Sequence, residues 1–410
     1  MKIINYIAPI ITLFLIIPHQ TLSMYTTFFR PTFWLEKPRF DRRNMTSYEL
    51  SPYYAWADKS FDKNGEKVPL LAFANPEPLL PSFLEPIKNC AYNSRKNDES
   101  PIGYAIFDAK YVTTVITNEI IQNFHENFFV QINIPLGLDT LKNISITPTN
   151  KAGVAIEHNE EIDTYLDALS SKLFESKNRN IQYSPFIGPS FILFGFTKSF
   201  THFTRLDLLD FEFKTGLVLP DHSLDKESDF LLLPRTNLNN YGIPFQLKCM
   251  IGIYDWLNFG VSATTVLHIK KDSIYKINQQ PYPNMLIIPT KKMASMLHYP
   301  FLAFTTYIEG ENFLPHWTWH VGLNFIKQLK TVFEICGGSA EENRIANQFP
   351  SQLPWEQISI TLSSEFDIFS QEGRIMPKIR ITYANRLFGK NCFDSSLVSG
   401  HLGFDVLYDF

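Results

Sequence analysis

Cysteine is scarce in this sequence, and charge of neither sign dominates it. Only 4 of the 410 residues are cysteine, which excludes a small domain held together by many disulfides. No two cysteines form a Cys-x-x-Cys pair, the usual ligand spacing of a structural zinc site. Lysine and arginine total 37 against 41 aspartates and glutamates, a formal net charge of −4. A basic surface of the kind that binds nucleic acid is therefore not expected.

Charged residues are also few, and aromatic residues are abundant. Asp, Glu, Lys and Arg together make up 19% of the chain, while aromatics reach 15% and include 36 phenylalanines. Disordered proteins have the opposite composition, because they are rich in charge and poor in aromatic side chains. The composition therefore predicts a folded chain with a large apolar surface to bury or to place in lipid.

Only one long apolar run is present, over residues 3–17 directly after Lys2. A basic residue, an apolar segment and small residues just before a cleavage point are typical of an export signal, so we expect cleavage after Ser23. Pro9 and Pro18 leave the run too short and broken for a membrane helix. Beyond Ser23 no run approaches the ~18 residues that such a helix needs.

The rest of the sequence alternates between apolar and polar residues. Segments of about 10 residues with this period have the length of a tilted membrane-spanning strand. Strands of a soluble sandwich are shorter, roughly 5–6 residues, so the length favours a membrane barrel. Three clear apolar faces are Phe245, Leu247, Cys249, Ile251 and Ile253; Phe259, Val261, Ala263, Thr265, Leu267 and Ile269; and Trp317, Trp319, Val321, Leu323 and Phe325.

The last segment carries the most specific pattern. One face holds Leu402, Phe404, Val406, Tyr408 and Phe410, and the chain stops on Phe410. In this it resembles the outer-membrane β-barrel proteins of Gram-negative bacteria, whose last strand alternates in the same way and ends in phenylalanine. The resemblance implies that Phe404, Tyr408 and Phe410 form the signal read by the barrel assembly machinery. The alternative is an ordinary amphipathic edge strand that ends in phenylalanine.

Counting back from this segment predicts an all-β fold, an antiparallel transmembrane barrel of about 12 strands with long outer loops. Both ends then lie on the periplasmic side, short turns lie there too, and every long connection lies outside. The predicted division is a signal peptide at 1–23, a periplasmic lead-in at 24–45 and an outer-membrane barrel at 46–410. The predicted strands are 46–57, 104–117, 127–138, 187–198, 203–218, 245–255, 258–270, 299–310, 316–327, 355–369, 375–385 and 397–410.

The outer connections 58–103, 139–186 and 328–354 are long and irregular. Residues 139–186 contain one stretch with helical spacing, at Ile162, Tyr165, Leu166, Leu169 and Leu173. We expect this amphipathic helix to fold into the lumen as a plug or to lie over the mouth.

The side chains that are expected to face the lumen are polar. Two neighbouring strands place residues of opposite charge across from one another. On the hairpin 355–385, the predicted register sets Ser363, Glu365 and Asp367 against Thr382, Arg380 and Lys378. The pairs either line a constriction or satisfy each other and rigidify the wall, and the second interpretation is favoured because ion pairs are often structural. The candidate lumen-lining residues are Glu365, Asp367, Lys378, Arg380, His401 and Asp405, with Glu212, Lys214, Lys248, His268 and Lys270 also expected to face inward.

Catalytic and cofactor sites are not expected. Ser399 and His401 share one face, without an obvious third member of a triad. His316 and His320 have the metal-ligand spacing of a helix, but on a strand four residues span roughly 13 Å. The sequence has no phosphate-binding loop and no dinucleotide motif. Cys90, Cys336 and Cys392 map to outer loops, where one disulfide is plausible, and Cys249 to a lipid-facing position.

Two functions from different classes remain open. A polar lumen predicts a passive, porin-like channel for ions or small solutes, without enzymatic activity. Long outer loops predict instead a surface-exposed structural or adhesion barrel with a plugged lumen. In either case the expected location is the bacterial outer membrane, and the expected partners are outer-membrane lipid, the barrel assembly machinery and small solutes, but not nucleic acid.

Overall fold

The fold is described from a computed structural model of the chain. The predicted signal peptide and nearly all of the lead-in lie outside the described residues, as do Tyr408 and Phe410 of the predicted assembly signal. The described residues are 45–71, 77–79, 103–125, 127–150, 155, 162–164, 166–167, 181–201, 207–220, 222–223, 241–254, 256–276, 291–298, 300–347, 354–368 and 375–407.

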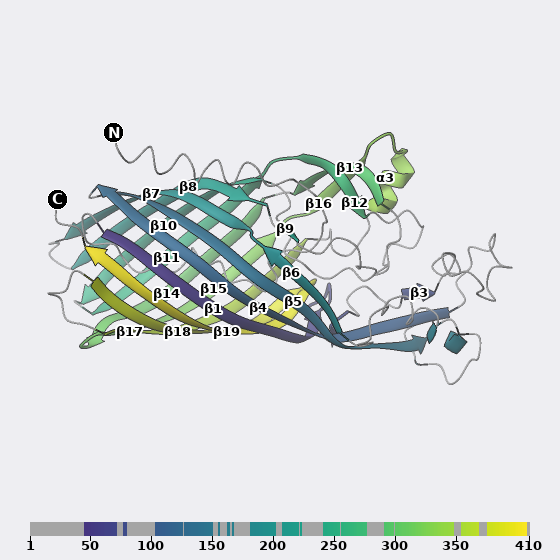
Figure 1. The fold of residues 1–410 in the computed structure, drawn as a ribbon, viewed down its shortest axis with the longest axis horizontal. Coiled ribbons are helices and arrows are strands. Elements are labelled where there is room, and N and C mark those ends of the chain that lie inside the picture. The colour runs from purple at the N-terminus through teal and green to yellow at the C-terminus, as the bar shows by residue number, and fades with distance from the viewer. Residues whose placement is uncertain are drawn as a thin grey trace.

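Twelve antiparallel strands form a closed β-barrel (Figure 1). Each strand pairs with its neighbour along the chain, and the first strand also pairs with the last, which closes the ring. All twelve predicted strands are confirmed, each overlapping one of the observed ones. They are β1 (Met45–Phe61), β4 (Gly103–His125), β5 (Phe128–Thr149), β7 (Ser190–Thr201), β8 (Leu208–Leu219), β10 (Gly242–Tyr254), β11 (Leu257–His268), β14 (Phe301–Leu314), β15 (Trp317–Gln328), β17 (Trp355–Asp367), β18 (Ile375–Lys390) and β19 (Cys392–Leu407).

The outer face of the barrel is apolar. On β10, for example, Phe245, Leu247, Ile251 and Ile253 are exposed, while the residues of the opposite face, Gln246, Lys248, Met250 and Gly252, are buried. Exposed apolar side chains on most of the wall suit contact with lipid, and a closed barrel leaves no strand edge whose backbone groups lack partners there. No helix in the described part of the chain is long and apolar enough to cross a membrane.

Aromatic rings cover glycines on the inner wall. Three inward glycines each lie opposite an aromatic residue on the neighbouring strand, and the ring lies over the space that a Cβ would fill. At Gly260 an added Cβ would lie 1.9 Å from Cζ of Tyr307. Each glycine therefore allows a large ring to fill the lumen without bending the wall. The three pairs are Gly137 with Phe186, Gly195 with Phe129, and Gly260 with Tyr307.

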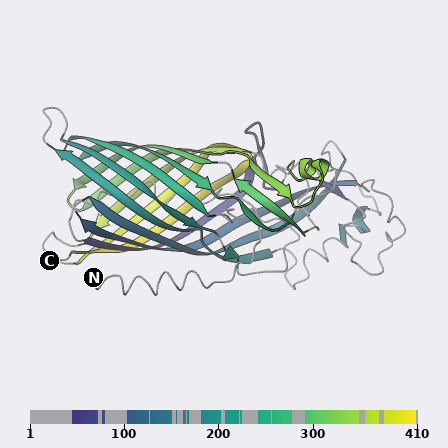
Figure 2. The same cartoon turned by 90° about the horizontal axis from the view of Figure 1, so that it is seen from above.

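Two strands extend well past the others at the end of the barrel opposite the start of β1 and the end of β19 (Figures 1 and 2). β4 and β5 are 23 and 22 residues long, and they stay paired as far as Tyr104 and Thr149. The prediction that the segment after residue 138 is a loop is wrong at its start, because strand pairing continues there to Thr149. Short strands add to this hairpin and to β1: β2 (Lys67–Pro69), β3 (Glu77–Leu79), β6 (Ile181–Ile187) and β9 (His222–Ser223).

A second, smaller sheet covers part of the same end. It consists of β12 (Lys271–Lys276), β13 (Lys291–His298) and β16 (Thr331–Ile335), with helix α3 (Ala340–Ala346) packed beside β16. Ser339 and Glu342 form a reciprocal capping box that begins this helix. The predicted irregular loop 328–354 is therefore partly ordered, since it provides both β16 and α3.

We expect acid to loosen this outer sheet before it affects the barrel. The hydrogen bond from Lys292 Nζ (2.8 Å) and the capping contacts with Ser339 lower the pKa of Glu342 from 4.5 to about 2. A lowered pKa stabilises the folded form above pH 4.5, and that contribution is lost as pH falls towards 2. The hydrogen-exchange protection factors of residues 339–347 should therefore fall in this range. Glu342→Gln should lower these protection factors at neutral pH and remove most of their pH dependence, whereas Glu66→Gln in the β1–β2 turn should leave the profile unchanged.

Candidate functional site

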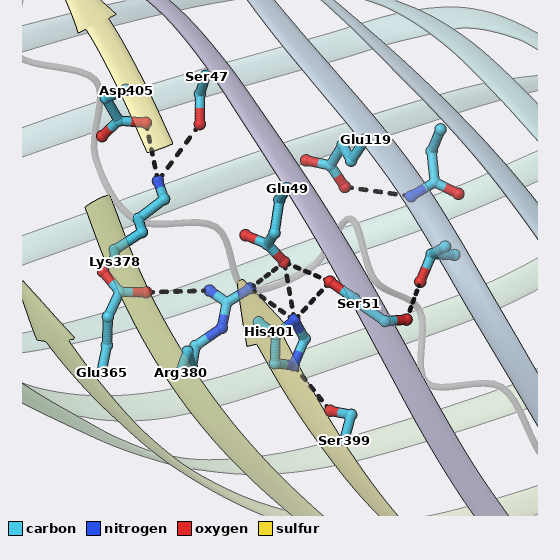
Figure 3. Close-up of polar contacts among 12 residues, drawn as sticks. Ser47, Glu49, Ser51, Glu119, Glu365, Lys378, Arg380, Ser399, His401 and Asp405 are labelled. Atoms are coloured by element: carbon cyan, nitrogen blue, oxygen red, sulfur yellow. Dashed lines mark hydrogen bonds and ion pairs between the residues drawn. The ribbon is translucent and has the colours of Figure 1, made fainter. Parts of the chain in front are cut away.

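A charged network joins the first and last strands inside the barrel (Figure 3). Glu49 of β1 accepts hydrogen bonds on Oε1 from Arg380 of β18 and from His401 of β19, each at 2.7 Å. Ser51, two residues along β1, donates to the same oxygen at 2.7 Å. The partners lie 331 to 352 residues apart in the sequence. This seam network, defined as Ser47, Glu49, Ser51, Glu365, Lys378, Arg380, Ser399, His401 and Asp405, therefore connects the two ends of the chain across the closure of the barrel.

The predicted ladder between β17 and β18 has the expected register. Glu365 pairs with Arg380, and Asp367 with Lys378, as cross-strand neighbours. Arg380 Nη1 lies 3.5 Å from Glu365 Oε2, while Lys378 Nζ lies 3.0 Å from Asp405 Oδ1. Lys378 also donates to Ser47 of β1 at 3.3 Å. The structure thus brings all six candidate residues into one group on neighbouring strands; their role in lining a conducting pore stays a prediction.

His401 also has the contacts of a triad histidine. The Ser399 hydroxyl lies 2.7 Å from Nε2, while Nδ1 faces Glu49. Glu49 is thus the third group that the sequence did not reveal, because it lies on the opposite end of the chain. The guanidinium of Arg380, however, is 3.3 Å from Nδ1, and a cation there opposes the imidazolium that a general base must form. Ser399 is only 2% exposed. The geometry therefore favours a structural polar network over a catalytic triad with Ser399 as the nucleophile.

A second polar group lies on the inner face of β8, β14 and β15. Lys214 Nζ pairs with Glu212 on the same strand at 2.8 Å, and Lys214 is 2% exposed. On β14 and β15, His320 stacks on Tyr307 with ring centroids 4.9 Å apart, and its Nδ1 lies 3.5 Å from Glu309. This group was only partly predicted, since Tyr307 and Glu309 were not singled out from the sequence.

Carboxylates outnumber cations on the inner wall of the described strands. Among inward-facing side chains there are ten acidic residues and five basic ones, so the wall is net negative even with its histidines neutral. The acidic set is Glu49, Glu119, Asp139, Asp210, Glu212, Glu309, Glu311, Glu365, Asp367 and Asp405, and the basic set is Lys214, Lys248, Lys378, Arg380 and Arg386.

Several smaller predictions need correction. Lys270 does not face inward, because it lies beyond the end of β11, is exposed and pairs with Glu334 at 2.9 Å. Cys392 is not in a loop but buried at the start of β19, since β18 and β19 are joined by a tight turn at Asn391. Cys249, Cys336 and Cys392, the described cysteines, are free. In the described part of the chain no three histidine, cysteine or carboxylate side chains are grouped to hold a metal ion.

Comparisons with known proteins find similarity among solved structures and in neither of the sequence-based comparisons. No protein-family model matches the chain, and no curated protein sequence matches it. Among solved structures, an outer-membrane channel from Pseudomonas putida F1 has a TM-score of 0.48 at 9% identity, covering 92% of this chain and 99% of that one. The translocator domain of the autotransporter NalP from Neisseria meningitidis has a TM-score of 0.35 at 9% identity, covering 90% and 89%. A FadL homologue from Pseudomonas aeruginosa has 0.30 at 8%, covering 89% and 91%.

The class of the protein follows from its own architecture. A closed ring of antiparallel strands, apolar outside and polar inside, satisfies every requirement of a membrane-spanning β-barrel. The protein is a closed, twelve-stranded antiparallel β-barrel of the membrane-spanning class.

Proposed function

We propose that the protein is a passive channel for ions or small solutes with a preference for cations. The observation that carries the proposal is the inner wall, where ten carboxylates face five basic side chains. A net negative wall in a confined, low-dielectric space raises the local concentration of cations.

The lumen supports a narrow path. Barrels of about eight strands are filled by side chains, and those with about 16 leave a wide aqueous channel; twelve strands lie between. Inward residues such as Ser47, Glu119 and Asn133 are less than a tenth exposed, so neighbouring side chains fill much of the cross-section. Small hydrated cations fit such a path better than sugars or peptides do.

Single-channel recording of the refolded protein in a planar bilayer tests this proposal. We expect small, steady conductance steps, and in a potassium chloride gradient a reversal potential of the sign that indicates cation selectivity. Glu365→Gln/Asp367→Asn should lower that selectivity. Absence of steps from protein that is shown to be folded would contradict the channel, and anion selectivity would contradict the role of the carboxylates.

The outer end favours a second candidate, binding at the cell surface. The extended β4–β5 hairpin and the sheet β12–β13–β16 with α3 are more structure than a minimal pore requires. Deleting residues 331–347 and shortening the hairpin should abolish surface binding and leave the barrel folded if this candidate holds. Unchanged adhesion by cells that display such a variant would exclude it.

A further inference from the structure

A charged row lies at the outer rim of the lipid-facing wall. Glu356 of β17 faces Lys327 of β15 and Lys390 of β18 as cross-strand neighbours. Its two carboxylate oxygens contact their ammonium groups at 3.2 and 3.0 Å. The adjacent row of lipid-facing side chains, closer to the centre of the membrane, is apolar and contains Phe325 and Phe388. The change from aromatic to charged side chains marks the level at which lipid headgroups meet the barrel.

This row forms one side of a pocket of about 680 Å³. Two further lysines line it, Lys63 from the β1–β2 turn and Lys330 just after β15. The four lysines face a single lining carboxylate, which both Lys327 and Lys390 already share. Lys63 and Lys330 form no ion pair with any residue that the structure describes. The nearby Asp62 accepts hydrogen bonds from backbone amides of its own turn. The pocket therefore has an excess of positive charge.

We propose that this rim pocket binds the phosphorylated headgroup of a lipid in the outer leaflet. Phosphate carries the charge that lysine ammonium groups recognise, and cationic side chains near a membrane surface attract anionic headgroups. The neighbouring apolar row would contact the acyl chains of the same molecule. A free phosphate would satisfy the lysines but would leave the apolar contact unused, so the lipid uses both features of the site.

Binding of lipid A to the folded full-length protein in phosphatidylcholine nanodiscs tests this proposal, with diphosphoryl and monophosphoryl lipid A as probes. We expect the diphosphoryl form to bind more tightly. Lys63→Gln/Lys330→Gln should weaken its binding by roughly 30-fold, about fivefold for each lysine. Neither lysine makes an ion pair in the described structure, so the variant should fold. Lys110→Gln/Lys142→Gln, which removes the same charge from the extended hairpin, is the matched control and should bind as the unchanged protein does.

The outcomes separate the possible ligands. Equal binding of the two lipid A forms, or equal weakening by the two double variants, would overturn the proposal. If a low concentration of inorganic phosphate displaced lipid A, the pocket would be a site for the free anion. This result would also overturn the proposal. The result is independent of conduction, because the pocket lies on the outer wall and the channel proposal depends on the inner one.

Discussion

Replacing Arg380 with methionine should lower the free energy of unfolding by about 3–5 kcal/mol, the range for removing one partner of a buried ion pair. The substitution leaves Glu49 and Glu365, whose side chains are 7% and 15% exposed, without their shared cation. Glu49 and Arg380 lie near opposite ends of the chain. The lost stability should therefore weaken the strand pairing that closes the barrel. Urea unfolding in lipid vesicles, followed by tryptophan fluorescence, measures the effect.

Two variants control for this prediction. Glu49→Gln/Arg380→Met removes the stranded charge as well, and it should recover part of the lost stability. Arg344→Met breaks the exposed pair with Glu341, whose side chains are 56% and 62% exposed, and should change stability by less than about 0.5 kcal/mol. Equal losses from Arg380→Met and Arg344→Met would show that the seam network does not stabilise the barrel.

Replacing Gly260 with alanine should cost about 3 kcal/mol, near the upper end for overpacking of a filled interior. The new methyl group would overlap the Tyr307 ring, and the ring cannot move freely. It stacks on His320 at 4.9 Å and lies 5.4 Å from the Lys248 ammonium group. The same urea titration reports the loss as a lower midpoint.

Gly400 provides the matched comparison, because a Cβ at that position on β19 meets no atom within 4 Å. Gly400→Ala should leave the midpoint unchanged. Gly260→Ala in a Tyr307→Ala background should cost much less than it does alone, since the overlapping ring is gone. A similar loss in both backgrounds would place the cost in the backbone and contradict the role of the ring.

The sequence predicted the wall of the barrel because its information is local. A strand in the wall has lipid on one side and polar groups on the other, so apolar and polar residues alternate along it. All twelve strands were found from this alternation. The register of the β17–β18 hairpin was also predictable. A short turn fixes which residues face each other, and Glu365 and Arg380 are separated by few residues.

The sequence did not reveal features that depend on distant partners. Glu49 contacts His401 only because β1 pairs with β19. The local alternation of apolar and polar residues does not predict that contact. Lys270 continued the alternation of β11, but the strand ends at His268 and Lys270 turns to Glu334. The sheet β12–β13–β16 has short strands from two separate loops. No single segment was long enough for an alternating pattern to predict this sheet.

Closure between the first and last strands is the central claim of the structure, and a cysteine cross-link tests it directly. Tyr48 of β1 and Phe404 of β19 are register partners on the outer wall, with ring centroids 5.4 Å apart. In a background in which the native cysteines are replaced by serine, Tyr48→Cys/Phe404→Cys should form a disulfide in isolated outer membranes. The pair Tyr48→Cys/Val398→Cys, six residues out of register, should not. Efficient cross-linking of the second pair, or none of the first, would contradict a barrel closed by β1 and β19.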